Sequence, residues 1–308
     1  RHILPRRGIT ARPEEVLLTL GAQNALWLSA QLLLTQRRTA AIENPGYAGL
    51  REVLAQTRCH RVPVDVDPQG LPAAELSPDI DVVFATPSHH SPTNVTMPLE
   101  RRKELLWRAG HDDFLIVEDD YEFEISATRA PYPALKSLDR DGRVIYIGSF
   151  SKSLFPGLRL GFLVGSEQFI KEARALRPSV LRHPPGHIQR TAAYFLSLGH
   201  YDSQINKISR AYAERRRVMQ EAIARHDLTP AGPEAHGGSS FWMKAPDGVN
   251  TAELAERLRD EQVLIEPGRT FFPPEQDNHQ FYRLAYSSIP AERIDEGIHR
   301  LARAMANP

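Results

Sequence analysis

The chain has 308 residues, with 38 Lys and Arg residues against 38 Asp and Glu residues, and 41% of its residues are hydrophobic. This composition is typical of a globular protein and excludes a disulfide-stabilised mini-domain, a disordered chain and a general polyanion-binding surface. No apolar run approaches the roughly 18–20 residues of a membrane span, so we expect no membrane partner. The single cysteine, Cys59, favours a reducing compartment, and we expect a cytoplasmic protein.

Short apolar runs alternate with amphipathic stretches along the first half of the chain, as they do in strand-helix-strand units. Strands are predicted at Val16–Leu20, Thr39–Glu43, Arg61–Val66, Asp81–Thr86, Phe114–Glu118, Arg143–Ile147 and Gly161–Val164. Helices are predicted at Gln23–Leu34, Tyr47–Gln56 and Leu99–Ala109. These elements indicate an α/β fold with a mixed seven-stranded sheet covered by helices.

After Gly165 the pattern changes to longer helices. They are predicted at Ser166–Ala175, at His187–Leu198 and across the charged stretch from Asp202 to His226. Strands at Phe241–Met243, Val263–Glu266 and Phe281–Tyr286, with helices at Thr251–Arg259 and Ala291–Ala306, then indicate a small α+β domain. We therefore expect a large domain over residues 14–200 and a small C-terminal domain over 201–308.

The first residues contain neither an initiator Met nor an apolar signal segment. We therefore expect residues 1–13 to be the N-terminal remnant of a longer chain.

The segment from Ser149 to Gly161, Ser-Phe-Ser-Lys-Ser-Leu-Phe-Pro-Gly-Leu-Arg-Leu-Gly, carries the most chemical information. Lys152 follows the end of a predicted strand, where α/β sheets bind ligands, and Arg159 follows seven residues later. A loop lysine is ordinarily a solvated surface charge. The functional interpretation is an imine-forming lysine, with Ser149 and Arg159 binding a phosphate.

Two further segments offer matching chemistry. Glu118-Asp119-Asp120-Tyr121 ends another strand, where Asp119 can keep a pyridine nitrogen protonated and Tyr121 can bond a ring oxygen; a solvated acidic loop is the alternative. The run Thr19-Leu20-Gly21-Ala22-Gln23 passes from a strand through a glycine into a helix. Such a junction can bind phosphate through free N–H groups, although it also serves simply to connect elements.

Together these segments resemble the fold-type-I pyridoxal-phosphate transferases, the fold of class I and II aminotransferases. By this resemblance Lys152 forms the internal aldimine with pyridoxal 5'-phosphate, and Asp119 pairs with the pyridine nitrogen. Tyr121 binds the phenolic oxygen, Tyr47 stacks on the ring, and Arg283 grips the substrate α-carboxylate. Phosphate ligands are implied at Ala22, Gln23, Ser149 and Arg159. A surface ion pair remains the alternative for Arg283, and packing after a Pro-Gly turn remains the alternative for Tyr47.

One loop departs from the aminotransferase pattern. Those enzymes commonly carry Asn-Pro-Thr-Gly where this chain has Ser91-Pro92-Thr93-Asn94, so Ser91 occupies the position of a cofactor-binding Asn. The neighbouring His89 and His90 have no further ligand cluster, and no metal site is expected.

The same loop, within Thr-Pro-Ser-His-His-Ser-Pro-Thr-Asn-Val-Thr-Met at 86–97, resembles MocR-type regulators of the GntR superfamily. That resemblance implies a domain that senses a small amino acid or amine through an external aldimine, as a homodimer, with DNA bound through a separate N-terminal domain. The alternative is a free-standing class I/II aminotransferase that moves an amino group to a 2-oxo acid. Transamination by this chain therefore stays open at this stage.

Overall fold

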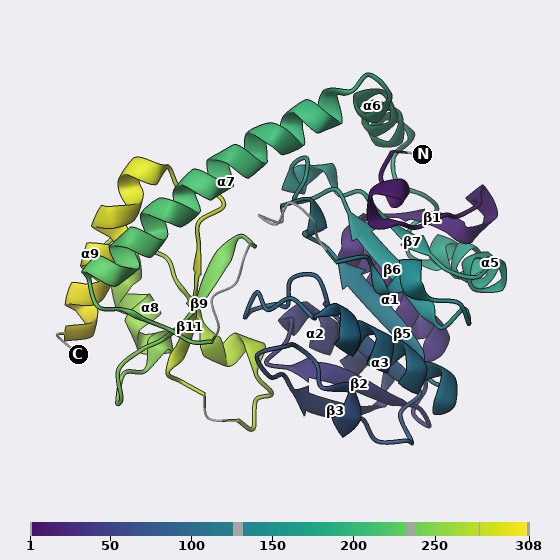
Figure 1. The fold of residues 1–308 in the computed structure, drawn as a ribbon, viewed down its shortest axis with the longest axis horizontal. Coiled ribbons are helices and arrows are strands. Elements are labelled where there is room, and N and C mark those ends of the chain that lie inside the picture. The colour runs from purple at the N-terminus through teal and green to yellow at the C-terminus, as the bar shows by residue number, and fades with distance from the viewer. Residues whose placement is uncertain (1, 126–131, 233–237, 277, 307–308) are drawn as a thin grey trace.

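The computed structural model describes residues 2–125, 132–232, 238–276 and 278–306. Its large sheet contains seven strands in the order β1-β7-β6-β5-β4-β2-β3 (Figure 1). The strands are β1 (Val16–Thr19), β2 (Thr39–Asn44), β3 (His60–Asp65), β4 (Val82–Ala85), β5 (Leu115–Asp120), β6 (Val144–Ser149) and β7 (Gly161–Val164). Strands β3, β2, β4, β5 and β6 are parallel, whereas β7 runs antiparallel to both of its neighbours.

Helices cover both faces of this sheet, because its central strands are apolar on both sides. On one face, buried side chains of the sheet pack against α1 (Gly21–Leu33), α2 (Ala48–Thr57) and α5 (Glu167–Leu176). The opposite face packs against α3 (Leu99–His111) and the short α4 (Leu135–Leu138). The result is a three-layer large domain whose parallel strands end at one common edge.

A smaller antiparallel sheet lies in the C-terminal part of the chain, in the order β10-β11-β9-β8. Its strands are β8 (Thr229–Pro230), β9 (Ser240–Lys244), β10 (Glu266–Pro267) and β11 (Phe281–Ala285). Its apolar core is shared with α7 (His200–Arg225), α8 (Thr251–Asp260) and α9 (Ile294–Ala306). Helix α7 starts beside α6 (Gly186–Ser197) near the large sheet and ends against α9 (Figure 1).

The predicted elements of the large sheet are confirmed, and the long helix predicted at 202–226 corresponds to α7. The strand predicted at Val263–Glu266 is wrong for most of its length, because β10 occupies Glu266–Pro267. Gln262 adopts a left-handed φ of 61°, and the Val263 N–H bonds back to the Leu258 carbonyl, which closes the end of α8 instead of extending a strand. The two-residue strand β8 was not predicted.

Residues 2–13 pack against the large domain. Ile3 and Ile9 join its apolar core, and Arg7 is only 2% exposed. The Arg7 guanidinium donates to Asp120 Oδ2 at 2.6 Å and to Ser88 Oγ at 2.9 Å. This segment therefore contributes a buried cation directly beneath the end of β5. The boundaries at 14 and 200 stay a prediction.

Several hydrogen bonds join the large sheet region to the small sheet region. Asn94 donates to the Ser240 carbonyl at 2.6 Å, and Ser239 Oγ donates to Glu122 Oε1 at 2.6 Å. The Gly46 N–H also donates to the Phe271 carbonyl at 2.8 Å. The small sheet is thus held against the edge where β4 and β5 end. None of the helices in the described part of the chain combines the length and apolar character that a membrane crossing requires.

The buried ion pair gives a first prediction. Arg7→Met should lower the free energy of unfolding by about 3–5 kcal/mol, because Asp120 would be left as an uncompensated buried charge. Urea denaturation measures this change, with the exposed Arg37→Met as the matched control. The double variant Arg7→Met/Asp120→Asn should lose less stability than Arg7→Met alone, and an equal or larger loss would contradict the argument.

Candidate active site

A cavity of about 300 Å³ lies where the ends of β5 and β6 meet the small sheet. Its lining includes all ten side chains that the sequence predicted for the cofactor and ligand site. They are Ala22, Gln23, Tyr47, Ser91, Asp119, Tyr121, Ser149, Lys152, Arg159 and Arg283. The structure thus brings together residues that are up to 261 positions apart, between Ala22 and Arg283.

Strand alternation decides which member of the acidic run faces the cavity. Successive side chains of a strand point to opposite faces, so Glu118 and Asp120 share one face of β5 while Asp119 lies on the other. Glu118 accepts hydrogen bonds from the backbone N–H groups of Leu135 and Lys136, and Asp120 pairs with Arg7. Asp119 alone of the three lines the cavity.

One oxygen of Asp119 is buried and unpaired within the described part of the chain. Its Oδ1 atom is buried and has no hydrogen-bond partner in the described residues. Burial, together with the nearby charges of Asp120 and Glu43, raises its pKa to about 7. Such a carboxyl group is a suitable acceptor for a cationic ring N–H, which would restore the ionised form.

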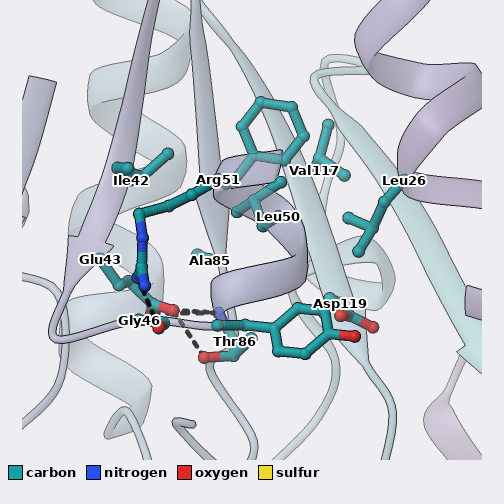
Figure 2. A pocket seen from close by; sticks show the side chains of 12 residues that line it. Leu26, Ile42, Glu43, Gly46, Leu50, Arg51, Ala85, Thr86, Val117 and Asp119 are labelled. Carbon is teal, nitrogen blue, oxygen red and sulfur yellow. Dashed lines mark hydrogen bonds between the residues drawn. The ribbon is translucent and has the colours of Figure 1, made fainter. Parts of the chain in front are cut away.

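A second, smaller cavity of about 20 Å³ adjoins Asp119, and it has room for roughly one water molecule. Figure 2 shows Asp119 at its edge and Glu43 bonded to Thr86 nearby. The Glu43 carboxylate accepts from the Thr86 N–H at 3.1 Å and from its hydroxyl at 2.6 Å. Glu43 is thereby anchored, and its charge remains a fixed neighbour of Asp119.

Lys152 lies three residues beyond the end of β6. Its Nζ atom is 3.8 Å from Oε1 of Glu122, whose side chain is 1% exposed. The same Oε1 atom accepts from Ser239, so Glu122 contacts the lysine and the small sheet region together. The amine therefore points into the cavity with a buried carboxylate as its neighbour.

The phosphate-binding residues meet at the start of α1. Gly21 has φ of +77°, and a Cβ atom there would lie 3.0 Å from Nη2 of Arg159. A Cβ atom on Gly161 would lie 2.8 Å from the Gly21 backbone, so close approach requires the glycine at 161 and the positive φ favours the glycine at 21. The first-turn N–H groups of α1, at Ala22 and Gln23, have no partners within the helix. This arrangement places a guanidinium beside free N–H donors, which is a suitable anion site.

Tyr121 and Tyr47 complete the cavity wall. Tyr121 and Ser91 both line the cavity, and burial and the charge of Glu122 raise the pKa of Tyr121 well above its ordinary value. Tyr47 is 42% exposed although it lines the cavity. Ser91 thus lines the same cavity as the phenol that was predicted to bind the cofactor oxygen.

Arg283 lies on β11, opposite Glu266 of β10. Its Nη1 donates to both Glu266 oxygens, at 2.8 and 2.9 Å, and its Nε donates to Ser240 Oγ at 2.8 Å. Among the described residues, no three His, Cys, Asp or Glu side chains gather as a metal-binding group.

Comparisons with known proteins agree with this geometry. A family model for aminotransferases of class I and II matches residues 2–301. The chain belongs to this aminotransferase family. Its structure matches that of LysN, an α-aminoadipate aminotransferase from Thermus thermophilus, with a TM-score of 0.90 and 30% identity over 99% of this chain and 81% of that one. The predicted fold-type-I transferase fold is therefore confirmed.

Two regulators are also similar to this aminotransferase-family chain. The HTH-type transcriptional regulator TauR of Rhodobacter capsulatus is 58% identical over 305 residues, which cover 99% of this chain and 63% of TauR. The probable rhizopine catabolism regulatory protein MocR of Rhizobium meliloti is 32% identical over 98% of this chain and 62% of MocR. The chain thus spans less than two thirds of the length of these regulators.

The residues present fit pyridoxal phosphate, the group that is bound as a phosphopyridoxyl-leucine adduct in the LysN structure. The unpartnered Asp119 Oδ1 matches a protonated ring nitrogen, and the cradle of Gly21 and Arg159 matches a phosphate. Lys152 offers an amine between them in the same cavity.

Some lining residues escaped the sequence analysis. Thr86, Ser151, Glu266 and Phe271 also line the cavity, and Glu122 contacts Lys152. Ser151 lies within the quoted lysine segment and could have been found there. Glu266 carries no local signal, because its importance comes from its pairing with Arg283 across two strands.

The raised pKa of Asp119 predicts a pH dependence. Its ordinary value is 3.8, so without cofactor the native state resists ionisation between about pH 4 and about pH 7, and stability is lost as the pH rises through that window. Asp119→Asn should therefore gain stability relative to the wild type as the pH rises, by on the order of a few kcal/mol, and the gain should level off above about pH 7. Urea denaturation of the cofactor-free proteins across this range measures it.

The exposed Asp141→Asn is the control for loss of one carboxylate at the surface. If the difference in free energy of unfolding between Asp119→Asn and the wild type stays constant with pH, the pKa of Asp119 is not raised by folding.

Proposed function

We propose that this chain is the pyridoxal-phosphate-binding, effector-sensing domain of a MocR-type transcription regulator. The observation that carries the proposal is the 58% identity to TauR over 99% of the chain, combined with a complete cofactor-type cavity. A free-standing aminotransferase is the second candidate, supported by the resemblance of the fold to LysN.

The side chains divide the binding of the cofactor among them. Arg159, Ser149 and the first turn of α1 would hold the phosphate, while Asp119 would accept the ring N–H and so keep the ring cationic. Tyr121 would donate to the ring oxygen, and Ser91 lines the same cavity. When bound, pyridoxal phosphate supplies an aldehyde that condenses with amines. Its ring withdraws electrons from the carbon atom that carries the ligand's amino group.

The remaining residues act on the amino ligand. Lys152 would hold the cofactor through its Nζ atom, which lies beside the buried Glu122 carboxylate, and an incoming amine would take its place there. Arg283 binds the acid group at the other end of the ligand. In an enzyme, Lys152 would go on to move the α-proton of the ligand; in a sensor, the event ends with the replaced lysine.

Partner interactions follow from the same proposal. The sensor forms a homodimer, in which the half-exposed Tyr47 edge of the cavity lies close to the second subunit. DNA is bound in the cytoplasm by a separate N-terminal domain of the longer protein. TauR and MocR support this organisation, because each is a regulator of which this chain matches less than two thirds.

Removal of the lysine tests the cofactor assignment. Purified protein supplied with pyridoxal phosphate should show a visible absorption band that Lys152→Ala lacks, whereas the exposed Lys171→Ala on α5 should keep it. Borohydride reduction followed by peptide mapping should place the label on Lys152. A label on another lysine would overturn the assignment.

The rate of transamination distinguishes a sensor domain from an aminotransferase. Ser91 is shorter than the Asn of aminotransferases and offers a single donor, so we expect ligand exchange without sustained transamination. Spectral titration with a panel of amino acids should proceed to saturation while formation of oxo acid with pyruvate or 2-oxoglutarate stays near zero. Several turnovers per second would favour the aminotransferase instead.

A further inference from the structure

The arginine that was predicted to grip a ligand's acid group is already occupied. Arg283 Nη1 donates to both oxygens of Glu266, and Arg283 Nε donates to Ser240 Oγ. A carboxylate that binds a guanidinium as a fork needs two adjacent N–H groups. Each pair of adjacent N–H groups on the guanidinium includes either Nε or Nη1, and both of these atoms are already bonded. A ligand's carboxylate can therefore bind as a fork only if the bond to Ser240 or the bonds to Glu266 break.

Glu266 is positioned to compete with a ligand's acid group for Arg283. It faces Arg283 directly in the register of β10 and β11, and both residues line the cavity that contains Lys152. The pairing is enforced by the antiparallel sheet, so Glu266 stays beside Arg283 in every state that preserves these strands. Its carboxylate occupies the guanidinium that a ligand's acid would need.

We propose that Glu266 is a specificity-determining residue, an internal competitor that the acid group of the ligand must displace from Arg283. The inference rests on the proposed function, because it takes the cavity to be the site of an amino ligand. The ligand class that it defines is an amine with an anionic group at its far end. Such a ligand gains contacts at Lys152 and at Arg283, but competition from Glu266 lowers its affinity for the cavity.

The exposure and charge of Glu266 favour its replacement by the ligand's acid over binding of both carboxylates to Arg283. The Glu266 side chain is 50% exposed and can move into water at little cost, whereas that of Arg283 is 16% exposed and needs a partner. Two carboxylates on the same guanidinium would repel each other. The arriving acid therefore replaces Glu266 on Arg283.

The test compares matched probes on the cofactor-loaded protein. Equilibrium titration uses glycine, β-alanine and 4-aminobutanoate, each paired with the n-alkylamine that lacks its carboxylate. Glu266→Gln should bind at least one acid-bearing probe tighter by about fivefold, since a neutral amide competes weakly, and should leave the alkylamines unchanged. The exposed Glu256→Gln on α8 removes one negative charge elsewhere in the small sheet region. It should change neither the affinity for the acid-bearing probes nor the affinity for the alkylamines.

Two outcomes overturn the proposal. If no acid-bearing probe gains affinity in Glu266→Gln, Glu266 does not compete for Arg283. If the variant weakens binding of either set, Glu266 stabilises the bound ligand instead of competing with it for Arg283. Comparison of the unfolding midpoints of the two variants with that of the wild type ensures that the affinities refer to folded protein.

Failure of the cofactor assignment, on which the proposed function depends, gives a different result. In that case the wild type shows no covalent cofactor at Lys152, and the titration has no signal. Phenylglyoxal labelling of Arg283 in cofactor-free protein, mapped by mass spectrometry, still tests the pair. Arg283 should react faster in Glu266→Gln than in the wild type, and added propanoate should slow that reaction. Equal labelling rates would refute shielding by Glu266.

Discussion

The buried ion pair between Arg7 and Asp120 allows three consecutive acids to end a central strand. Without a cation on that face, Glu118 and Asp120 would repel each other in a dry interior. Arg7 neutralises Asp120, and backbone N–H groups satisfy Glu118. The one remaining carboxyl group, on Asp119, then faces the cavity with a buried oxygen that has no partner of its own among the described residues. The electrostatics of the whole site follow from this division.

Sheet geometry explains why the other residues meet there. Parallel strands end at a common edge, so the segments after β4, β5 and β6 bring Ser91, Tyr121 and Lys152 to one place. The antiparallel β7 returns from the Arg159 turn and brings that guanidinium back to the start of α1. The small sheet then closes the cavity from the opposite side with Arg283.

Local patterns predicted the parts of the site that depend on local chemistry. Apolar runs identified every strand of the large sheet, and the lysine segment with its downstream Arg159 identified the anion cradle. Arg7 could not be found in this way, because its role depends on Asp120, 113 positions away. Glu266 escaped for a similar reason: its strand has two residues, too few to leave a periodic signal. Such contacts are set by tertiary packing, which no short window of sequence contains.

Helix α7 joins the region of the large sheet to the core of the small one as a single rod of 26 residues. At 1.5 Å per residue it is about 39 Å long. One end packs beside α6 and the segment after β5, and the other end packs against α9. A straight lever of this length converts a tilt of roughly 5° at one end into a displacement of about 3 Å at the other. A tilt of α7 too small to alter any fold element would therefore be enlarged by distance alone at the far end of the helix.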